Sequence, residues 1–344
     1  EDVSWDFNTD PANVELGKII LQIQIQEAKT GQVGFGAGYS NNTGLTGFLS
    51  YSERNLKGMG RRISTQLEFG KKRDDFQIGY FEPWIDKKQT SLEVNVYNTS
   101  QQDLTYGLGG ISSSDYEEMH RGMNFTVGRP VSDNTRAYVG LKAENVNVEP
   151  STYDYLDGAI HSMSFSLRTD TRDNIFFPTT GRYDTGTLES IGGFLGGDYT
   201  YQKIDFDLRR FYPIKKKQAI GGHMYLGLSK DNVPRFDWYD IGGVNTVRGY
   251  DEYEFSGMKC MYFNAEYRIK LGGNVSGVLF SDAGAVWNRF KDISLKPKDY
   301  VKSVGAGIRL NIPQLGIMGP IRLDYAYALS KQDSKIHFGF GHMF

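Results

Sequence analysis

The residue types that most often carry out catalysis are present in this sequence, but their spacing does not fit a catalytic site. The five histidines are spread over the predicted strands, and only the last two of them share one strand: His120, His161, His223, His337 and His342. The sequence contains no HExxH metal motif, no CxxC pair and no G-x-S-x-G nucleophile element. Residues 34–38 (GFGAG) lie in a predicted strand and open no helix, so they do not predict a nucleotide site. We therefore expect no enzymatic activity, no cofactor and no bound metal.

An acidic turn and a single cysteine are the remaining reactive groups. Asp170 and Asp173 could bind Ca²⁺ or cap the turn in which they lie, and we favour capping. Cys260 is the only cysteine, so an internal disulfide is impossible. At a strand position it is expected to act as a small apolar residue.

An arginine among glycines is the third chemical feature. Arg248 follows Gly242 and Gly243 and precedes Gly249, so the backbone can bend tightly and approach other chain closely. Considered alone, Arg248 could be a solvated loop cation. A guanidinium is also suited to gripping carboxylates in a partly desolvated place, because its planar fork donates to both oxygens.

The amino-acid composition argues against several classes of protein. The 344 residues include 39 Lys and Arg against 41 Asp and Glu, and this balance gives no reason to expect nucleic acid as the partner. No apolar run approaches the roughly 18 residues of a membrane helix. Aromatic residues make up 14% of the chain, which argues against disorder. The 41 Gly, 22 Tyr and 21 Phe suit strands that are apolar on one face.

Apolar residues recur with a period of two along nearly the whole chain, and the opposite faces carry charge. Ile204, Phe206 and Leu208, for example, alternate with charged residues. Counting such segments after residue 31 predicts about 16 strands. Their predicted centres are residues 36, 48, 66, 79, 95, 124, 140, 165, 186, 206, 225, 266, 281, 307, 325 and 340.

Strand length and loop pattern favour a membrane barrel over a soluble protein. Strands of about 9–13 residues are long for a sandwich but suit a tilted membrane strand. Short turns also alternate with longer loops, as in outer-membrane barrels. A soluble β-rich protein would share the period of two, so periodicity alone does not decide. We predict an all-β fold, with one antiparallel transmembrane β-barrel of about 16 strands over residues 31–344.

Residues 1–30 are predicted to form a separate unit. Residues 16–27 (LGKIILQIQIQE) read as a strand that would be one too many for an even-stranded barrel. We expect it to be the last strand of a small soluble domain that is mostly absent from this chain. The chain starts at Glu1 without an apolar leader, as expected of a mature or truncated protein.

Three segments resemble the BamA superfamily, which comprises outer-membrane insertases and related polypeptide transporters. Residues 246–250 (TVRGY), after 239–243 (YDIGG), resemble the VRG(F/Y) loop of that family. Residues 170–181 (DTRDNIFFPTTG) are similar to its R-D-x-x-x-F-P-T-x-G turn, and residues 31–39 with 53–60 (ERNLKGMG) to its first hairpin. The motifs keep the family's order and spacing. In that light, residues 1–30 match the end of the last POTRA domain, a periplasmic module.

The resemblance implies that the loop folds back into the barrel. The loop motif consists of Val247, Arg248, Gly249 and Tyr250. Arg248 would there meet acidic residues on lumenal strand faces, and by position these resemble Glu266 and Asp282. Strand parity independently directs Glu266 inward. The apolar residues on the Asp282 face, which we expect to pack against the loop, are Val278, Phe280 and Val286.

Glycines reduce the side-chain contacts of the first and last barrel strands. The first has Gly34, Gly36 and Gly38 on one face, and the last has Gly339 and Gly341. Each interior glycine costs about 0.5–1 kcal/mol, so the three in the first strand would weaken the seam by roughly 1.5–3 kcal/mol. The glycines could instead leave lumenal room for a packed loop. We favour a lateral gate, mainly because of the resemblance.

The end of the sequence resembles the C-terminal signal that barrel-assembly machinery reads. The matching residues are His337, Gly339, His342 and Phe344. His342 departs from the hydrophobic residue that is usual there. The parity of the strand predicts an outward, lipid-facing row: Ile336, Phe338, Phe340 and Phe344.

The resemblance implies an assembly factor that folds and inserts β-barrel proteins through a gate between its first and last strands. It would be an integral protein of a Gram-negative outer membrane with a periplasmic N-terminus. The implied partners are outer-membrane lipid, unfolded β-barrel clients, periplasmic chaperones and accessory subunits, with no nucleic acid. Two alternatives stay open: a polypeptide translocator of TamA-like or two-partner secretion type, and a passive porin.

Overall fold

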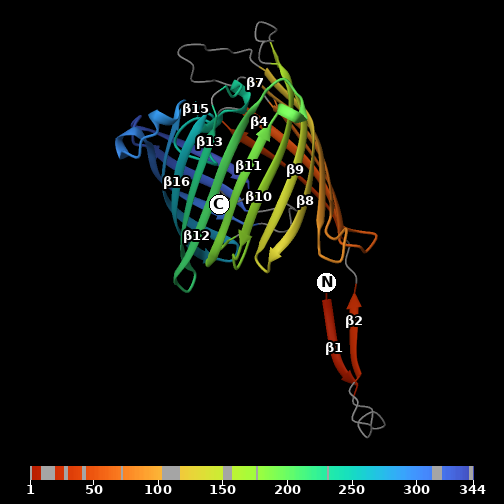
Figure 1. Cartoon of the computed structure of the whole chain (residues 1–344). Helices are drawn as coiled ribbons and strands as arrows, with labels where there is room; N and C mark the ends of the chain where they lie inside the picture. Colours follow the sequence, from red (N-terminus) through yellow and green to blue (C-terminus); the bar gives the residue numbers. More distant parts are fainter. Residues whose placement is uncertain are drawn as a thin grey trace.

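Sixteen antiparallel strands form one sheet that curves into a barrel (Figure 1). The computed structural model describes residues 2–8, 20–26, 30–40, 44–70, 73–102, 117–149, 157–175, 177–230, 232–311, 320–340 and 344. Along the chain the barrel strands are β3 (Gly31–Ser40), β4 (Gly44–Leu56), β5 (Arg61–Gly70), β6 (Arg73–Glu82), β7 (Ser91–Gln102), β8 (Glu117–Ser132), β9 (Thr135–Glu149), β10 (Gly158–Asp170), β11 (Gly181–Ile191), β12 (Tyr201–Lys215), β13 (Gln218–Ser229), β16 (Lys259–Gly272), β17 (Val275–Trp287), β18 (Val301–Leu310), β19 (Ile321–Ala328) and β20 (Asp333–Phe340). The predicted all-β barrel is confirmed, and each predicted centre falls within one of these strands.

The remaining elements are short. Two small hairpins are β1 (Asp2–Asn8) with β2 (Ile20–Gln26), and β14 (Tyr239–Ile241) with β15 (Phe255–Gly257). The 3-10 turns are η2 (Gly193–Leu195), η3 (Arg235–Asp237), η4 (Phe290–Asp292) and η5 (Pro297–Asp299). Within the described ranges, none of the helices is long and apolar enough to cross a membrane.

The alternating sequence pattern places apolar side chains on the outside of the barrel. On β10, Met163, Phe165 and Leu167 are exposed, whereas Ser162 and Ser166 point inward and hydrogen-bond side chains of β11. This is the reverse of a soluble sheet, whose apolar face is buried. An exposed apolar outer wall with a polar lumen is the arrangement that a bilayer requires of a barrel.

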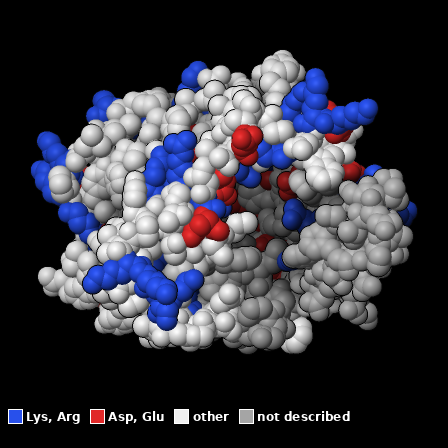
Figure 2. All heavy atoms as spheres, turned by 90° about the horizontal axis from the view of Figure 1, so that it is seen from below, with Lys and Arg blue, Asp and Glu red and all other residues white. Residues whose placement is uncertain are grey.

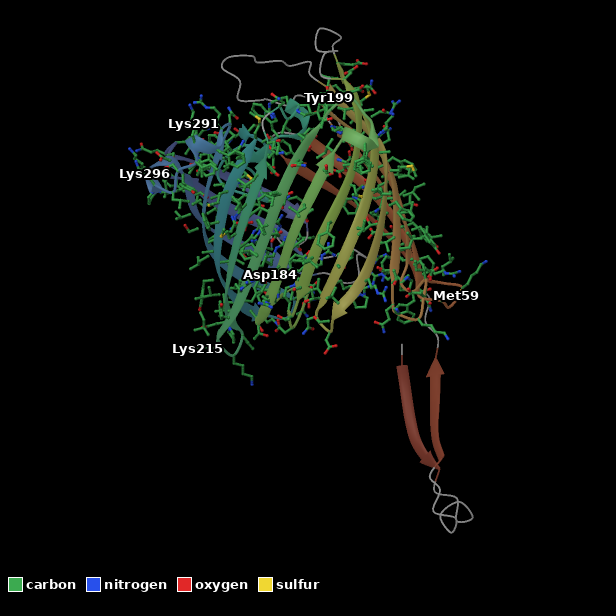
Figure 3. All side chains as sticks on the ribbon, viewed as in Figure 1. Met59, Asp184, Tyr199, Lys215, Lys291 and Lys296 are labelled. Carbon is green, nitrogen blue, oxygen red and sulfur yellow. The ribbon has the colours of Figure 1, made fainter. Side chains whose placement is uncertain are left out.

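The two ends of the barrel differ. Met59, in the turn after β4, and Lys215, the last residue of β12, lie at the end that carries the β1–β2 hairpin, which we call the N-terminal end (Figures 1 and 3). Tyr199, Lys291 and Lys296 lie at the opposite, loop end (Figure 3). The longest connection at the loop end, residues 230–258, joins β13 to β16 and contains β14 and β15.

The turn between β10 and β11 shows how the short connections are held. Asp173 accepts hydrogen bonds from the backbone N–H groups of Thr179 and Thr180, at 2.8 and 3.1 Å, and from the Thr179 hydroxyl at 2.5 Å. Although partial burial alone would raise the pKa of Asp173, these hydrogen bonds hold it below its ordinary value. Its carboxylate therefore caps the turn, as favoured from the sequence.

The sheet begins and ends at β3 and β20. These two strands lie next to each other, since parts of them come into contact. All other neighbours in the ring are joined by an antiparallel register, which shifts near one end in four of the pairs, and no register joins the described residues of β3 and β20. We call this place the seam. The β1–β2 hairpin precedes β3, and its assignment to a POTRA domain stays a prediction.

Candidate functional site

The connection between β13 and β16 turns into the barrel, and its central segment is fully enclosed. Ile241, Val247 and Tyr250 have no solvent-exposed area, and they pack with Cys260 and Val286 of the barrel wall. This packing matches the expected roles of the Cys260 and Val286 side chains. We call residues 242–254 the lumenal loop.

Two glycines allow this close packing. Gly249 has φ of 92°, and a Cβ added there would lie 3.2 Å from the backbone nitrogen of Ala328 on β19. Gly242 has φ of 112°, and a Cβ there would lie 2.3 Å from the carbonyl oxygen of Asp251. Any other residue would be strained by its backbone conformation and by these contacts.

Arg248 is held by two carboxylates from the facing strands. Its Nε and Nη2 each donate a 2.8 Å hydrogen bond to Asp282 of β17, and its Nη1 donates a 2.9 Å bond to Glu266 of β16. The Arg248 backbone N–H also donates to Asp282, at 3.1 Å. All three side chains are almost completely buried. The loop motif and its two predicted carboxylates are thus brought together in the lumen.

The Phe280 ring and the Asn264 amide complete the Arg248 site. The guanidinium carbon lies 3.4 Å from the centre of the Phe280 ring, a cation–π contact in a desolvated place. The Asn264 amide donates to Asp282 at 2.9 Å and to the carbonyl of Thr246 at 2.6 Å. Asn264 therefore fixes both the carboxylate and the loop backbone that Arg248 needs.

A third carboxylate and three further arginines were missed from the sequence. Asp324 of β19 lies 3.5 Å from Nη1 of Arg248 and pairs with Arg309 at 2.5 Å. Arg268 pairs with Glu266 at 2.8 Å, and Arg322 donates to the Asn245 side chain of the loop at 2.6 Å. Period-two alternation can direct these residues into the lumen, but it cannot show which strands meet the same loop.

The lumenal loop also holds the last barrel strand. The Gly249 N–H donates a 2.8 Å hydrogen bond to Nε2 of His337, and Lys335 pairs with Asp251 at 2.5 Å. The Tyr250 hydroxyl donates a 3.0 Å bond to the carbonyl of Lys302, next to the start of β18. Together with the Arg248 contacts, these bonds link the loop to each strand from β16 to β20.

The glycines at the seam also make room for neighbouring side chains. A Cβ at Gly36 would lie 2.4 Å from the Phe48 ring of β4, which covers this glycine on the lumenal side. A Cβ at Gly339 would lie 3.0 Å from Arg322 and 3.2 Å from Val244 of the loop. Gly34 and Gly38 lie on β3 as expected. Gly341 lies outside the described residues.

The sequence prediction that Phe344 faces lipid is wrong. Phe344 is buried in the lumen, where its ring stacks on Phe211 with the centroids 6.2 Å apart. Phe344 lies beyond Phe340, the last residue of β20, so the parity of β20 does not fix the direction of the Phe344 side chain. Ile336 is on the outside as predicted, and His337 is buried inside. His342 and the Phe340 side chain lie outside the described residues.

The outward apolar wall, the polar lumen and the anchored loop define a transmembrane β-barrel protein of the outer-membrane type. Residues 55–344 match the Omp85 superfamily domain. The chain belongs to the Omp85 superfamily. This finding agrees with the resemblance drawn from the loop, turn and hairpin motifs.

Known relatives cover most of this chain. It is 27% identical to outer envelope protein 80 of the rice chloroplast over 94% of this chain and 52% of that protein. It is 24% identical to the outer membrane protein assembly factor BamA of Neisseria meningitidis over 95% of this chain and 48% of that protein. The chain thus spans about half the length of the curated relatives it matches.

Two kinds of solved structure share the fold. BamA from Haemophilus ducreyi lacking POTRA domains 1–3 aligns with a TM-score of 0.72 at 20% identity, over 99% of this chain and 75% of that one. CdiB from Acinetobacter baumannii aligns with a TM-score of 0.65 at 17% identity, over 98% of this chain and 64% of that one. At these identities the likeness shows the fold alone.

Proposed function

We propose that this protein folds β-barrel proteins and inserts them into an outer membrane through lateral opening of the seam between β3 and β20. The observation that carries the proposal is that the lumenal loop holds together one part of the barrel wall. The lumenal loop binds each strand from β16 to β20. The wall from β16 to β20 should therefore move as one body, and the seam next to it is the place where the barrel opens.

The seam is also suited to template a client strand. An opened β3 presents unpaired N–H and C=O groups, and such an edge pairs readily with another extended chain. On the outside Val33 and Phe35 are exposed and apolar, so the edge would lie at the level of the acyl chains. A client strand could then form backbone hydrogen bonds while its apolar face enters lipid.

Strand length supports insertion at this place. β19 has 8 residues and the described part of β20 also has 8, whereas the described parts of β8 and β9 on the other wall have 16 and 15. A strand rises about 3.3 Å per residue, so the wall beside the seam is much shorter. A shorter apolar wall thins the adjoining bilayer, which lowers the cost of inserting a new strand.

The orientation and partners follow from the same proposal. We place the N-terminal end, with residues 1–30 as the end of a POTRA domain, in the periplasm of a Gram-negative bacterium. Unfolded barrel clients would reach the seam from that side with periplasmic chaperones, and accessory subunits would bind there. The assembly-factor name of the Neisseria relative supports this assignment.

Reconstitution tests the proposal against the translocator and the porin. The chain in lipid vesicles should accelerate folding of a urea-denatured client barrel, read as heat-modifiable gel mobility and protease protection. Vesicles that hold a sixteen-stranded porin are the control. A translocator would instead bring a soluble polypeptide into the vesicles, and a porin would only conduct ions. Client folding no faster than in the control vesicles would reject the insertase function.

A further inference from the structure

Two arginines lie on the outer wall of the barrel, among side chains that are apolar. Arg182 of β11 and Arg210 of β12 are direct partners across the two strands. Their side chains are 52% and 38% exposed. Tyr212 and Ile214, which share the outer face of β12 with Arg210, are exposed as well. A charge at such a place needs a polar partner, because the acyl chains of a bilayer offer none.

The two arginines share a single carboxylate, that of Asp184 on β11. Asp184 accepts a hydrogen bond from Nη1 of Arg210 through one oxygen, and its other oxygen lies 3.6 Å from Nε of Arg182. In the described part of the chain, no other carboxylate pairs with either arginine. Like charges directly opposite each other on a sheet repel, and Asp184 compensates only one of the two. One positive charge therefore remains on this part of the outer wall.

Lysines continue the positive charge towards the N-terminal end of the barrel. Lys215 ends β12, and Lys216 and Lys217 form the exposed turn that follows. Arg210 precedes Lys215 by five residues, about 16 Å along the strand. Figure 3 shows Asp184 further from the N-terminal end than Lys215. We call Arg182, Arg210 and residues 215–217 the basic strip.

The view from the N-terminal end shows where the charges of both signs gather. Lys and Arg lie around the outer rim of the barrel, and most of the visible Asp and Glu lie nearer the central hollow (Figure 2). The negative side chains at this end thus lie mainly inside the ring of positive ones. An anion at the outer surface would therefore meet basic groups first.

The wall beside the two arginines has room for a ligand with an apolar tail. Gly222 of β13 is the partner of Arg210 on the side away from Arg182, and a Cβ added to Gly222 would have no atom within 4 Å. Towards the loop end, Leu188 of β11 and Phe206 of β12 are 54% and 42% exposed on the same outer face. The basic strip thus lies next to an open, apolar surface.

This combination fits a phospholipid. Guanidinium groups bind phosphate well, because their planar N–H groups can donate to two oxygens at once. Clustered lysines at a membrane surface attract anionic lipids, and tyrosine is common at the level of the headgroups. A zwitterionic headgroup also carries an ammonium group, which the lysines would repel. The charge of the strip therefore favours an anionic headgroup.

We propose that the basic strip binds the headgroup of an anionic phospholipid. The phosphate would lie at Arg182 and Arg210, with the acyl chains along Leu188 and Phe206 and the rest of the headgroup towards the lysines. Asp184 competes with the phosphate for the two guanidinium groups. This lipid site is independent of whether the barrel inserts clients or translocates them.

Native mass spectrometry of the full chain, released from detergent, tests the site by titration with lipid. Wild type should bind a first molecule of dioleoyl phosphatidylglycerol at least about tenfold more tightly than dioleoyl phosphatidylethanolamine, which has the same acyl chains and no net charge. Arg182→Gln with Arg210→Gln should weaken the binding of phosphatidylglycerol at least about tenfold. Equal affinity of wild type for the two lipids would overturn the proposal.

A charge-matched control and a substitution of opposite effect separate the site from net charge and from structure. Lys87→Gln with Lys88→Gln removes two charges from the exposed turn between β6 and β7 at the same end, and it should change the affinity less than about twofold. Asp184→Asn removes the competing carboxylate, so phosphatidylglycerol should bind about two- to fivefold more tightly. Equal losses in the two double variants, or weaker binding by Asp184→Asn, would contradict the site.

Two measurements on wild-type protein locate the lipid and identify its source. Phosphatidylglycerol with a diazirine on the first carbons of an acyl chain should cross-link to β11, β12 and β13, and adducts confined to other strands would overturn the proposal. Inorganic phosphate in tenfold excess over the lipid should leave the lipid bound, because it lacks the acyl chains. Displacement by inorganic phosphate would assign the site to the free anion and reject the lipid.

Discussion

The backbone N–H of Gly249 in the lumenal loop donates a 2.8 Å hydrogen bond to Nε2 of His337 on the last barrel strand. This bond joins the loop, which Arg248 anchors on β16 and β17, to the strand that borders the seam. Nε2 of His337 accepts this bond and so carries no proton, and both partners are buried. The position of the loop and the freedom of β20 are thereby coupled.

Removing the acceptor at His337 should loosen β20. His337→Leu leaves the buried Gly249 N–H without a partner, at a cost of about 1–3 kcal/mol. His337→Gln keeps an acceptor and should recover part of that loss. Amide hydrogen exchange across residues 333–340 should be faster in the Leu variant than in the Gln variant. Equal protection in wild type and both variants would show that the bond does not hold the strand.

Replacing Arg248 should be far more damaging than replacing a surface arginine. Arg248→Ala leaves the buried Asp282 without its charged partner, which costs about 3–5 kcal/mol, while Glu266 keeps Arg268 and Arg309. Arg248→Lys should rescue only partly, since Lys lacks the planar fork that spans both carboxylates. The free energy of unfolding in urea and the heat-modifiable gel mobility report the change.

Arg289 is the matched control for Arg248. Its ion pair with Asp292 has a donor–acceptor distance of 2.8 Å but is solvent-exposed. An exposed pair contributes about 0–1 kcal/mol, so Arg289→Ala should unfold close to wild type. If Arg248→Ala were as stable as Arg289→Ala, the loop would not be anchored by Arg248.

Substitution of Gly36 tests whether the seam glycines weaken the β3 edge or make room for a neighbouring side chain. Gly36→Ala should push its Cβ into the Phe48 ring and cost about 1–3 kcal/mol through overpacking. In a Phe48→Ala background the same change should be nearly neutral, and unfolding free energies of the four proteins give the coupling. A large coupling means that Gly36 makes room for Phe48. An equal cost in both backgrounds would assign its effect to the β3 backbone alone.

A charged side chain should lower the free energy of unfolding much more on the outer, lipid-facing wall than on the lumenal face. Phe206 is exposed on the outside of β12, and Phe206→Arg should cost about 2–4 kcal/mol near the bilayer midplane. Gln77 lines a polar cavity inside the barrel with Asp75 and Glu144, so Gln77→Arg should cost much less. Unfolding from lipid vesicles measures both. Similar costs at the two positions would contradict the assignment of the faces.

The sequence predicts the strands of the barrel wall better than the contacts inside the lumen. Alternation is a local property, so it places all sixteen strands and directs Glu266 inward. The meeting of Arg248 with Asp324, or of Gly249 with His337, depends on how deep the loop enters and which strands curve around it. No periodicity records that geometry. The prediction for Phe344 was wrong for a related reason: its side chain lies against Phe211 and His223 in the lumen, and alternation does not record such contacts.

Locking the seam is the most direct test of lateral opening. In a Cys260→Ser background, cysteine pairs are scanned between outward positions of β3 and β20, combining Val33→Cys or Phe35→Cys with Ile336→Cys or Phe338→Cys. The control pair is Tyr325→Cys with Ile336→Cys, which face each other on β19 and β20, strands that are already hydrogen-bonded. Client folding by the chain in vesicles is then compared before and after oxidation. The seam disulfide should block client folding, reduction should restore it, and the control disulfide should have no effect. Client folding at the uncross-linked rate by a fully cross-linked seam would contradict lateral opening.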